Sequence, residues 1–385
     1  MIYLDNAATT KLHKKVIDEM NKTYDTMFFN PSSQYEPAKK TKSRIESVKD
    51  YMKKNLGLNL GEIIFTSSTT ESNNLYIKSI VSKYCNNKKI NIIATNIDHP
   101  SIYNQVKDYE SSSDIDIKYS KLTDIGKIDK KDLINKIDDS TKLVILTHVN
   151  SETGIIEDIE DIAFEIKKKN PDIKIFVDGA QAVGKINVNL PKQIDGYSFS
   201  SHKIHGPKGV SALYVKDIKD LTTILKGGKQ ENGVRPGTYN THSIIGFEKA
   251  FEIAQLSLDE NHQKVNKLKV AFIESIKDLN SVFILDDSST NPYILSIAFK
   301  DIKAEVIVRM LSDQGVYVST GSSCSSGTKN SNRVVKNIKK FPNEYKEGNI
   351  RISFSAFNTL EEVEKASIIL KKIIKRLEKI FNKGN

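Results

Sequence analysis

The chain has 385 residues, which is long for a single core, so two domains, or one large and one small, are expected. Its content of 38% hydrophobic and 28% charged residues is that of an ordinary globular protein. The formal net charge of +10 comes from lysines scattered among acids, without a recognition motif, and this pattern argues against direct nucleic-acid binding. Two cysteines exclude a disulfide framework or a cysteine metal cluster, and the lack of an apolar run of roughly 18 residues or of a signal peptide predicts a cytoplasmic protein without a membrane partner.

Strands and helices are expected to alternate along the first two thirds of the chain. The expected strands lie at 63–65, 92–95, 143–149, 175–178, 197–199 and 210–215, and the expected helices at 14–24, 37–57, 75–84, 159–169 and from 242 onward. Polar turns around an edge strand and a short helix are expected over 111–140. This alternation predicts an α/β fold with a mostly parallel central sheet and helices on both faces.

The last third alternates differently. Strands are expected at 293–299, 316–318 and 350–354 and helices at 304–314 and after Thr359, whose sequence forms a capping box. We expect a large domain over 13–257 and a small α+β domain formed by 1–12 with 258–385. One long helix that begins near His242 would leave the large domain around 255–265.

A hydroxyl-rich segment, Thr66-Ser67-Ser68-Thr69-Thr70, stands between an expected strand and an expected helix. Unpaired N–H groups and the helix dipole make such a helix start a good anion site. The alternative is that Thr69 or Thr70 simply caps the helix. The segment is not a P-loop, because the required glycine and lysine are absent.

The segment between Ile175 and Gly209 is the most informative part of the sequence. One apolar run ends in Asp178 and a second ends in Ser200-Ser201-His202-Lys203. Pyridoxal phosphate needs a lysine for its aldehyde and an acid for its pyridine nitrogen, and hydroxyl and imidazole groups can hold its phosphate. Taken alone, Lys203 would more often be an ordinary surface lysine, and its sequence context favours the cofactor role. Strands that end at an acid and at a lysine predict one cleft at the carboxyl edge of the sheet.

Three further residues are candidates for chemistry. His99 follows an expected strand and could stack or transfer protons, although an isolated loop histidine is often incidental. Cys324 lies in a loop of serine and glycine, where a cationic neighbour would make it a better nucleophile. Arg351 could bind a carboxylate with two parallel hydrogen bonds or form a surface salt bridge.

Together these motifs resemble a cysteine desulfurase of the NifS/IscS family, a class V member of the fold-type-I pyridoxal-phosphate enzymes. The resemblance runs from Tyr3 to the strand at Arg351. It rests on the segments YLDNAATT, FTSSTTESNN, VNSETG, VDGAQAVGK, SFSSHKIHGPKG, GVRPGT and GSSCSSG, which occur in the family's order.

The resemblance implies that L-cysteine is converted to L-alanine while its sulfur passes to Cys324 as a persulfide. Lys203 would carry the cofactor and move protons, with His99 stacked on the ring. The other implied cofactor contacts are Asp178, Gln181, Ser151, Thr69, Thr70, Ser200, His202 and, from the second subunit of a homodimer, Thr238. Arg351 and Asn30 would bind the substrate. No metal site is implied, and the sulfur would go to an acceptor protein such as an iron–sulfur scaffold or a tRNA-thiolation enzyme.

Three positions depart from the family pattern. Ser151 stands where the family has asparagine, Tyr35 stands where it has histidine, and the segment after Cys324 is more polar and basic than usual. The first departure predicts altered substrate handling or slow turnover. Two alternatives stay open: a selenocysteine lyase or other class V lyase, which would not need the thiol of Cys324, and a catalytically poor protein that binds the cofactor as a scaffold or regulator.

Overall fold

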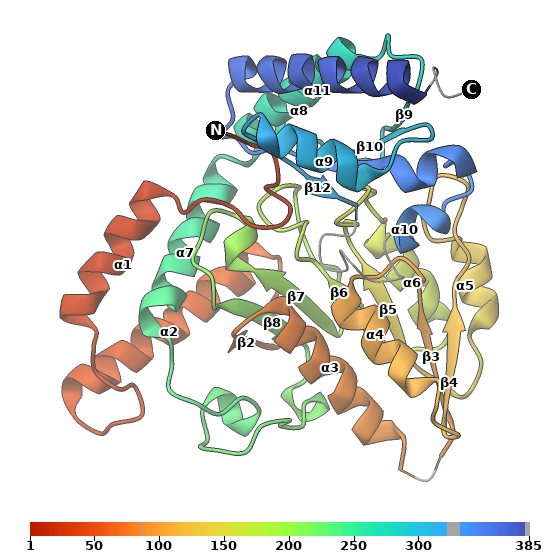
Figure 1. The fold of residues 1–385 in the computed structure, drawn as a ribbon. Coiled ribbons are helices and arrows are strands. Elements are labelled where there is room, and N and C mark those ends of the chain that lie inside the picture. Colours follow the sequence, from red (N-terminus) through yellow and green to blue (C-terminus); the bar gives the residue numbers. More distant parts are fainter. Residues whose placement is uncertain (87, 322–331, 382–385) are drawn as a thin grey trace.

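The structure is a computed structural model that describes residues 1–86, 88–321 and 332–381 (Figure 1). Its centre is a sheet of seven strands in the order β2-β8-β7-β6-β5-β3-β4. The strands are β2 Glu62–Thr66, β3 Ile90–Ala94, β4 Ile115–Tyr119, β5 Thr141–Thr147, β6 Lys174–Asp178, β7 Gly196–Ser200 and β8 Ser211–Val215. Only β8 runs against its neighbours, so the mostly parallel sheet predicted from the sequence is confirmed.

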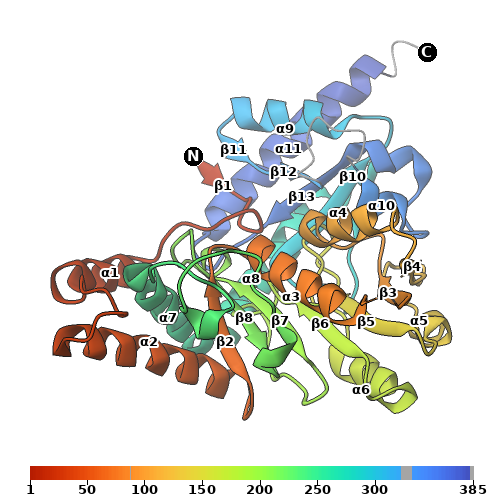
Figure 2. The ribbon, with the colours of Figure 1, turned by 90° about the horizontal axis from the view of Figure 1, so that it is seen from below.

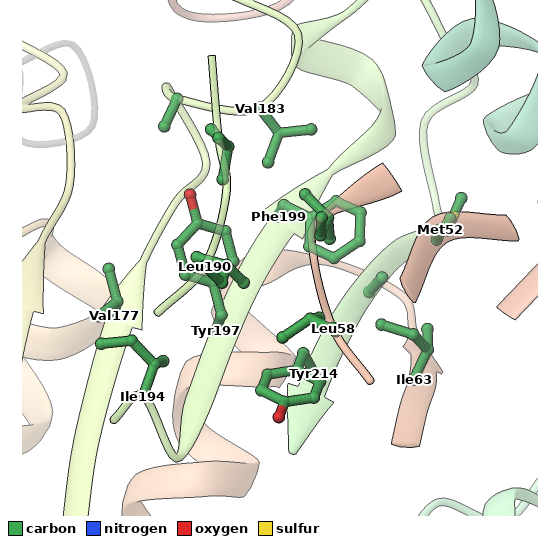
Figure 3. Close-up of a cluster of buried hydrophobic side chains, with 14 of the residues drawn as sticks. Met52, Leu58, Ile63, Val177, Val183, Leu190, Ile194, Tyr197, Phe199 and Tyr214 are labelled. Carbon is green, nitrogen blue, oxygen red and sulfur yellow. The ribbon is translucent and has the colours of Figure 1, made fainter. Parts of the chain in front are cut away.

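Both faces of this sheet are covered by helices. These are α1 Lys14–Thr26, α2 Glu36–Asn55, α3 Thr69–Tyr84, α4 Pro100–Tyr109, α5 Lys130–Lys136, α6 Ile159–Lys169 and α7 Thr241–Leu256. Successive residues of a strand point to opposite faces. Accordingly, Val177 packs in the core under α2, α6 and α7, whereas its neighbour Phe176 packs in the core under α3 and α4. Figure 3 shows the first of these cores around Tyr197 and Phe199.

The remaining elements form a smaller unit beside the carboxyl edge of the large sheet (Figure 2). Its antiparallel sheet has the order β12-β13-β10-β9. The strands are β9 Val282–Leu285, β10 Ile294–Phe299, β12 Ser319–Thr320 and β13 Asn349–Ser353, and the helices are α8 Leu258–Ile276, α9 Ala304–Asp313, α10 Arg333–Lys336 and α11 Leu360–Phe381. A separate short pair joins β1 Ile2–Tyr3 to β11 Val316–Tyr317.

The division into 13–257 and 1–12 with 258–385 stays a proposal, and the packing supports it. One apolar cluster of the smaller unit unites Leu4 with Val265, Phe299 and Val363, so the first residues pack with the last third of the chain. None of the described helices is long and apolar enough to span a membrane.

Three local features differ from the expectations. The segment after His99 is a helix, α4, with Pro100 in its first turn, where a missing N–H costs nothing. The long helix expected from His242 is two helices, α7 and α8, separated at Ser257. Strand β9 was not predicted although its four residues, Val282–Leu285, are all apolar, because so short a run does not distinguish a strand from other apolar segments.

Candidate active site

One cavity of about 450 Å³ lies at the carboxyl edge of the large sheet, a volume that suits a cofactor with a small substrate. Strands β5, β6 and β7 end beside it, and the amino end of α3 closes one side. The predicted site residues on its lining are Thr69, Thr70, His99, Ser151, Asp178, Gln181, His202, Lys203 and Arg351. The predicted cleft is thus confirmed as a single cavity.

Lys203 ends a single turn of 3₁₀ helix that follows β7 directly. Its Nζ donates hydrogen bonds to the main-chain oxygens of Ala7 and Ala8, at 2.6 and 2.7 Å. These oxygens belong to the amino-terminal segment, which therefore crosses the site close to the reactive amine. These two hydrogen bonds hold the ammonium group of Lys203 in place.

Asp178 is the last residue of β6, and its carboxylate is buried. One oxygen accepts a hydrogen bond from the Nδ2 of Asn73 at 3.0 Å, and the other accepts from the N–H of Ala180 at 3.0 Å. Ser198 donates to the Oδ1 of Asn73 at 2.7 Å, which fixes the amide so that its nitrogen faces the acid. The carboxylate is thereby held rigidly at the cavity wall.

His99 is the residue before α4, and its ring lines the cavity. Its Nδ1 lies 2.8 Å from the Oγ of Ser101. Burial lowers the pKa of His99, and the positive charges of Lys203 and Arg351 lower it further, although Asp178 acts in the opposite direction. The imidazole is therefore neutral at pH 7, and a neutral ring can stack on an aromatic group.

The amino end of α3 carries the hydroxyl-rich segment. Ser68, rather than Thr69 or Thr70, caps the helix, because its Oγ accepts from the N–H of Glu71 at 3.1 Å. Both threonines line the cavity instead. This arrangement supports the anion site over the capping alternative.

Two neighbours complete this end of the cavity. Arg235, in the loop between β8 and α7, donates from its Nε to Glu71 at 2.8 Å and so ties that loop to the start of α3. His202 lies opposite, and burial together with the charge of Lys203 lowers its pKa to about 3. A neutral His202 can donate one hydrogen bond to an anion without adding charge.

Arg351 reaches the cavity from β13 of the smaller unit. Its guanidinium donates to the main-chain oxygen of Ser151 at 2.9 Å and to the carboxylate of Asp5 at 2.7 Å. The side chain is buried, at 5% of its full exposure. The cation is thus fixed where a substrate carboxylate can reach it.

Sequence reasoning missed three residues of this site. Asn73 was considered only as part of the segment FTSSTTESNN. The signal that could have identified it is an amide on the face of a helix that packs against the end of a strand. Glu152 and Arg333 also line the cavity. Burial raises the pKa of Glu152 to about 7, against the opposing charges of Arg333 and Arg351.

Four predicted residues are not on the lining. Ser200 is buried, and its hydroxyl meets the Oγ of Ser211 at 3.1 Å. Asn30 and Thr238 are exposed, and Asn30 accepts a hydrogen bond from the N–H of Ser32 at 3.0 Å. Cys324 lies outside the described residues, and Gly321, three positions before it in the sequence, lines the cavity.

The family model described as aminotransferase class V matches residues 2–366. The "Cysteine desulfurase IscS" of Dictyoglomus turgidum is 34% identical over 382 residues, which cover 98% of this chain and 96% of that protein. A solved "NifS-like protein" superposes with a TM-score of 0.89 at 31% identity, covering 97% of this chain and 99% of the other.

A second solved structure, the NifS-like protein of Rickettsia africae, gives a TM-score of 0.85 at 29% identity and covers 97% of this chain and 99% of its own. The family match, the full-length sequence similarity and the structural likeness agree with the arrangement around Lys203 and Asp178. This chain therefore belongs to the aminotransferase class V family, in its NifS/IscS branch of cysteine desulfurases.

Proposed function

We propose that this protein is a pyridoxal-phosphate-dependent cysteine desulfurase, which converts L-cysteine to L-alanine and keeps the sulfur on a cysteine as a persulfide. The observation that carries the proposal is the convergence of Lys203, Asp178 and His99 in one cavity that Arg351 also lines. An amine, a buried acid, a neutral ring and a guanidinium are the groups that this cofactor and an amino-acid carboxylate need.

The side chains present fit pyridoxal phosphate. Thr69, Thr70 and His202 surround the amino end of α3, where a phosphate would meet unpaired N–H groups. Asp178 would hold a proton on the pyridine nitrogen, because Asn73 and Ala180 keep its carboxylate in place. When bound, the cofactor supplies an electron sink that weakens the bonds at the substrate Cα and Cβ.

The remaining steps belong to side chains of the chain itself. Arg351 would bind the substrate carboxylate, since its guanidinium is already fixed by Asp5 and Ser151. Lys203 would accept the Cα proton and later return a proton. Its position just after β7, on the cavity lining, places its amine near the substrate. The neutral ring of His99 would stack on the cofactor and keep it oriented.

Cys324 would be the nucleophile. Its thiolate would attack the substrate sulfur, so that a sulfur–sulfur bond forms while the bond between Cβ and sulfur breaks, and the electron pair passes to the carbon side. A proton returned to Cβ would then release alanine. The persulfide on Cys324 would be delivered to an acceptor protein, for which an iron–sulfur scaffold and a tRNA-thiolation enzyme both remain proposals.

We also propose a homodimer in the cytoplasm. Thr238 is exposed on the loop that follows Arg235, where it could reach a phosphate in a second copy of the chain. Exposed aromatic residues support a subunit contact: Phe28 is 66% exposed and Tyr35 is 52% exposed. Asn30 lies between them in the sequence and is exposed as well, and its contact with the substrate stays a proposal.

Replacing Lys203 tests the cofactor assignment. Lys203→Ala should lose the absorbance of covalently held pyridoxal phosphate after desalting and should form no alanine from L-cysteine. Lys208→Ala, an exposed lysine five residues further along, should keep both properties. If Lys203→Ala retained the absorbance and the turnover, the proposed function would be wrong.

A further inference from the structure

A second lysine, Lys185, lies behind Lys203 and is 4% exposed. Both lysines line a smaller cavity of about 120 Å³ between the large and small units, together with His205 and Tyr293. Burying a lysine is costly unless its amine is well paired. Among the described residues, the hydrogen-bond partner of Lys185 is an amide, Gln181, and not a carboxylate.

Gln181 hydrogen-bonds to Lys185 through one end of its amide and to the main chain through the other. Its Oε1 accepts a hydrogen bond from the Nζ of Lys185 at 2.6 Å, and its Nε2 donates to the main-chain oxygen of Ala7 at 2.9 Å. The same oxygen of Ala7 accepts from Lys203 at 2.6 Å. Thus Lys185, Gln181 and Lys203 form one buried chain of hydrogen bonds that ends at the reactive amine.

An amide side chain can turn over and exchange its donor and acceptor ends. A lysine donor beside Oε1 prevents this, because the reversed amide would set two donors against each other. Burial strongly lowers the pKa of Lys185, and the charges of Lys203 and Arg351 add to this effect. Both the charged and the neutral amine can donate to Oε1, and in either state the Ala7 oxygen accepts from Nε2, so both contacts favour the observed orientation of Gln181.

We propose that Lys185 is a positioning residue that acts through Gln181. By holding the amide oxygen, it helps to keep the amide nitrogen beside Ala7 on the cavity lining, where the second N–H of the amide can donate to the ring oxygen of pyridoxal phosphate. A donor at that oxygen stabilises its ionised form and so lowers the pH at which the bound cofactor titrates. This inference rests on the proposed function, since it concerns the same cofactor.

The experiment is a pH titration of the absorbance of bound pyridoxal phosphate in the purified full-length protein. Lys185→Met keeps the length of the side chain but removes the donor, and it should raise the midpoint by about one unit, a tenfold change in proton affinity. Lys185→Arg keeps a donor and should restore most of the wild-type midpoint. Lys269→Met, which replaces another lysine that is 4% exposed, should leave the midpoint unchanged.

A double variant separates positioning from simple charge. In the background of Gln181→Leu, Lys185→Met should cause little further shift, because the amide through which it acts is gone. A full additional shift would overturn the proposal, as would a Lys185→Met midpoint equal to that of the wild type. If the wild type itself bound no pyridoxal phosphate, the proposed function would fail first, and the inference with it.

Discussion

The Nδ2 of Asn73 lies 3.0 Å from a carboxylate oxygen of Asp178, and this contact joins helix α3 to the end of strand β6. The same amide nitrogen lies 2.9 Å from the Oγ of Ser101, and the amide oxygen accepts from Ser198 at 2.7 Å. One buried asparagine therefore links three segments around the acid on which the cofactor assignment depends. The contact makes the start of α3 and the acid a single rigid unit.

The first prediction concerns this contact. Asn73→Ala removes one hydrogen bond to a charged group and should weaken the retention of pyridoxal phosphate by about tenfold or more. Asn55→Ala, an exposed asparagine of α2, is the control and should have no effect. Equilibrium dialysis of the cofactor measures both, and equal affinities would show that Asp178 does not need this support.

The second prediction concerns Ser151, whose main-chain oxygen accepts from Arg351. Ser151→Asn places a longer side chain with both a donor and an acceptor beside the expected position of the substrate carboxylate. It should raise kcat/KM for L-cysteine by about tenfold, the value of one hydrogen bond. Ser151→Ala should give no gain, and an Asn variant that matched the wild type in turnover and cofactor spectrum would contradict the prediction.

The third prediction concerns pH and Glu152, which burial holds at a pKa of about 7 against an ordinary value of 4.5. At a pH below the ordinary pKa, the carboxyl group is protonated in both the folded and the unfolded protein, so no charge has to be buried. As pH rises through the folded value, ionisation in the buried site costs stability, up to about 3 kcal/mol. Glu152→Gln removes that cost.

Thermal unfolding at about pH 5 and about pH 8 measures this effect. The Tm of Glu152→Gln relative to the wild type should increase between the lower and the higher pH. Glu364→Gln, at an exposed glutamate of α11, should show no such increase. A Tm difference for Glu152→Gln that stayed constant across this range would mean that the carboxyl ionises as freely in the folded protein as in the unfolded one.

The fourth prediction compares two buried tyrosines. The hydroxyl of Tyr76 has no hydrogen-bond partner within the described residues, and its ring stacks on Phe176 at 4.7 Å. The hydroxyl of Tyr197 lies 2.9 Å from the Nδ1 of His148. Tyr76→Phe should therefore stabilise the protein by about 1 kcal/mol, and Tyr197→Phe should destabilise it by a similar amount. Chemical denaturation of both variants checks the signs, and equal signs would contradict the argument.

Much of the fold could be predicted because the central strands are buried on both faces. Continuous apolar runs such as 175–177 mark strands of that kind, and several of them, such as 63–65 and 143–149, are followed by a helix. Short elements escaped for physical reasons. A helix that begins at Pro100 looks like a loop until its first-turn proline is recognised, and the break at Ser257 between α7 and α8 leaves no proline or glycine signal.

The candidate site was predictable only where chemistry marks a residue. Lys203 and Asp178 could be predicted because each stands at the end of an expected strand. Lys185 and Glu152 look like ordinary surface charges in the sequence, and only the packing shows that both are buried beside the cavity. The expected place of Thr238 depends on a second subunit, which a single chain does not contain.

The most direct test of the account is the alanine and sulfide formed from L-cysteine and a reductant by the wild type, Cys324→Ser and Cys85→Ser. We predict that the wild type and Cys85→Ser produce both compounds and that Cys324→Ser produces neither while still binding pyridoxal phosphate. Equal alanine from all three proteins would contradict the account and indicate a lyase that needs no thiol. No product from any of them, with the cofactor bound, would contradict it in favour of a cofactor-binding scaffold.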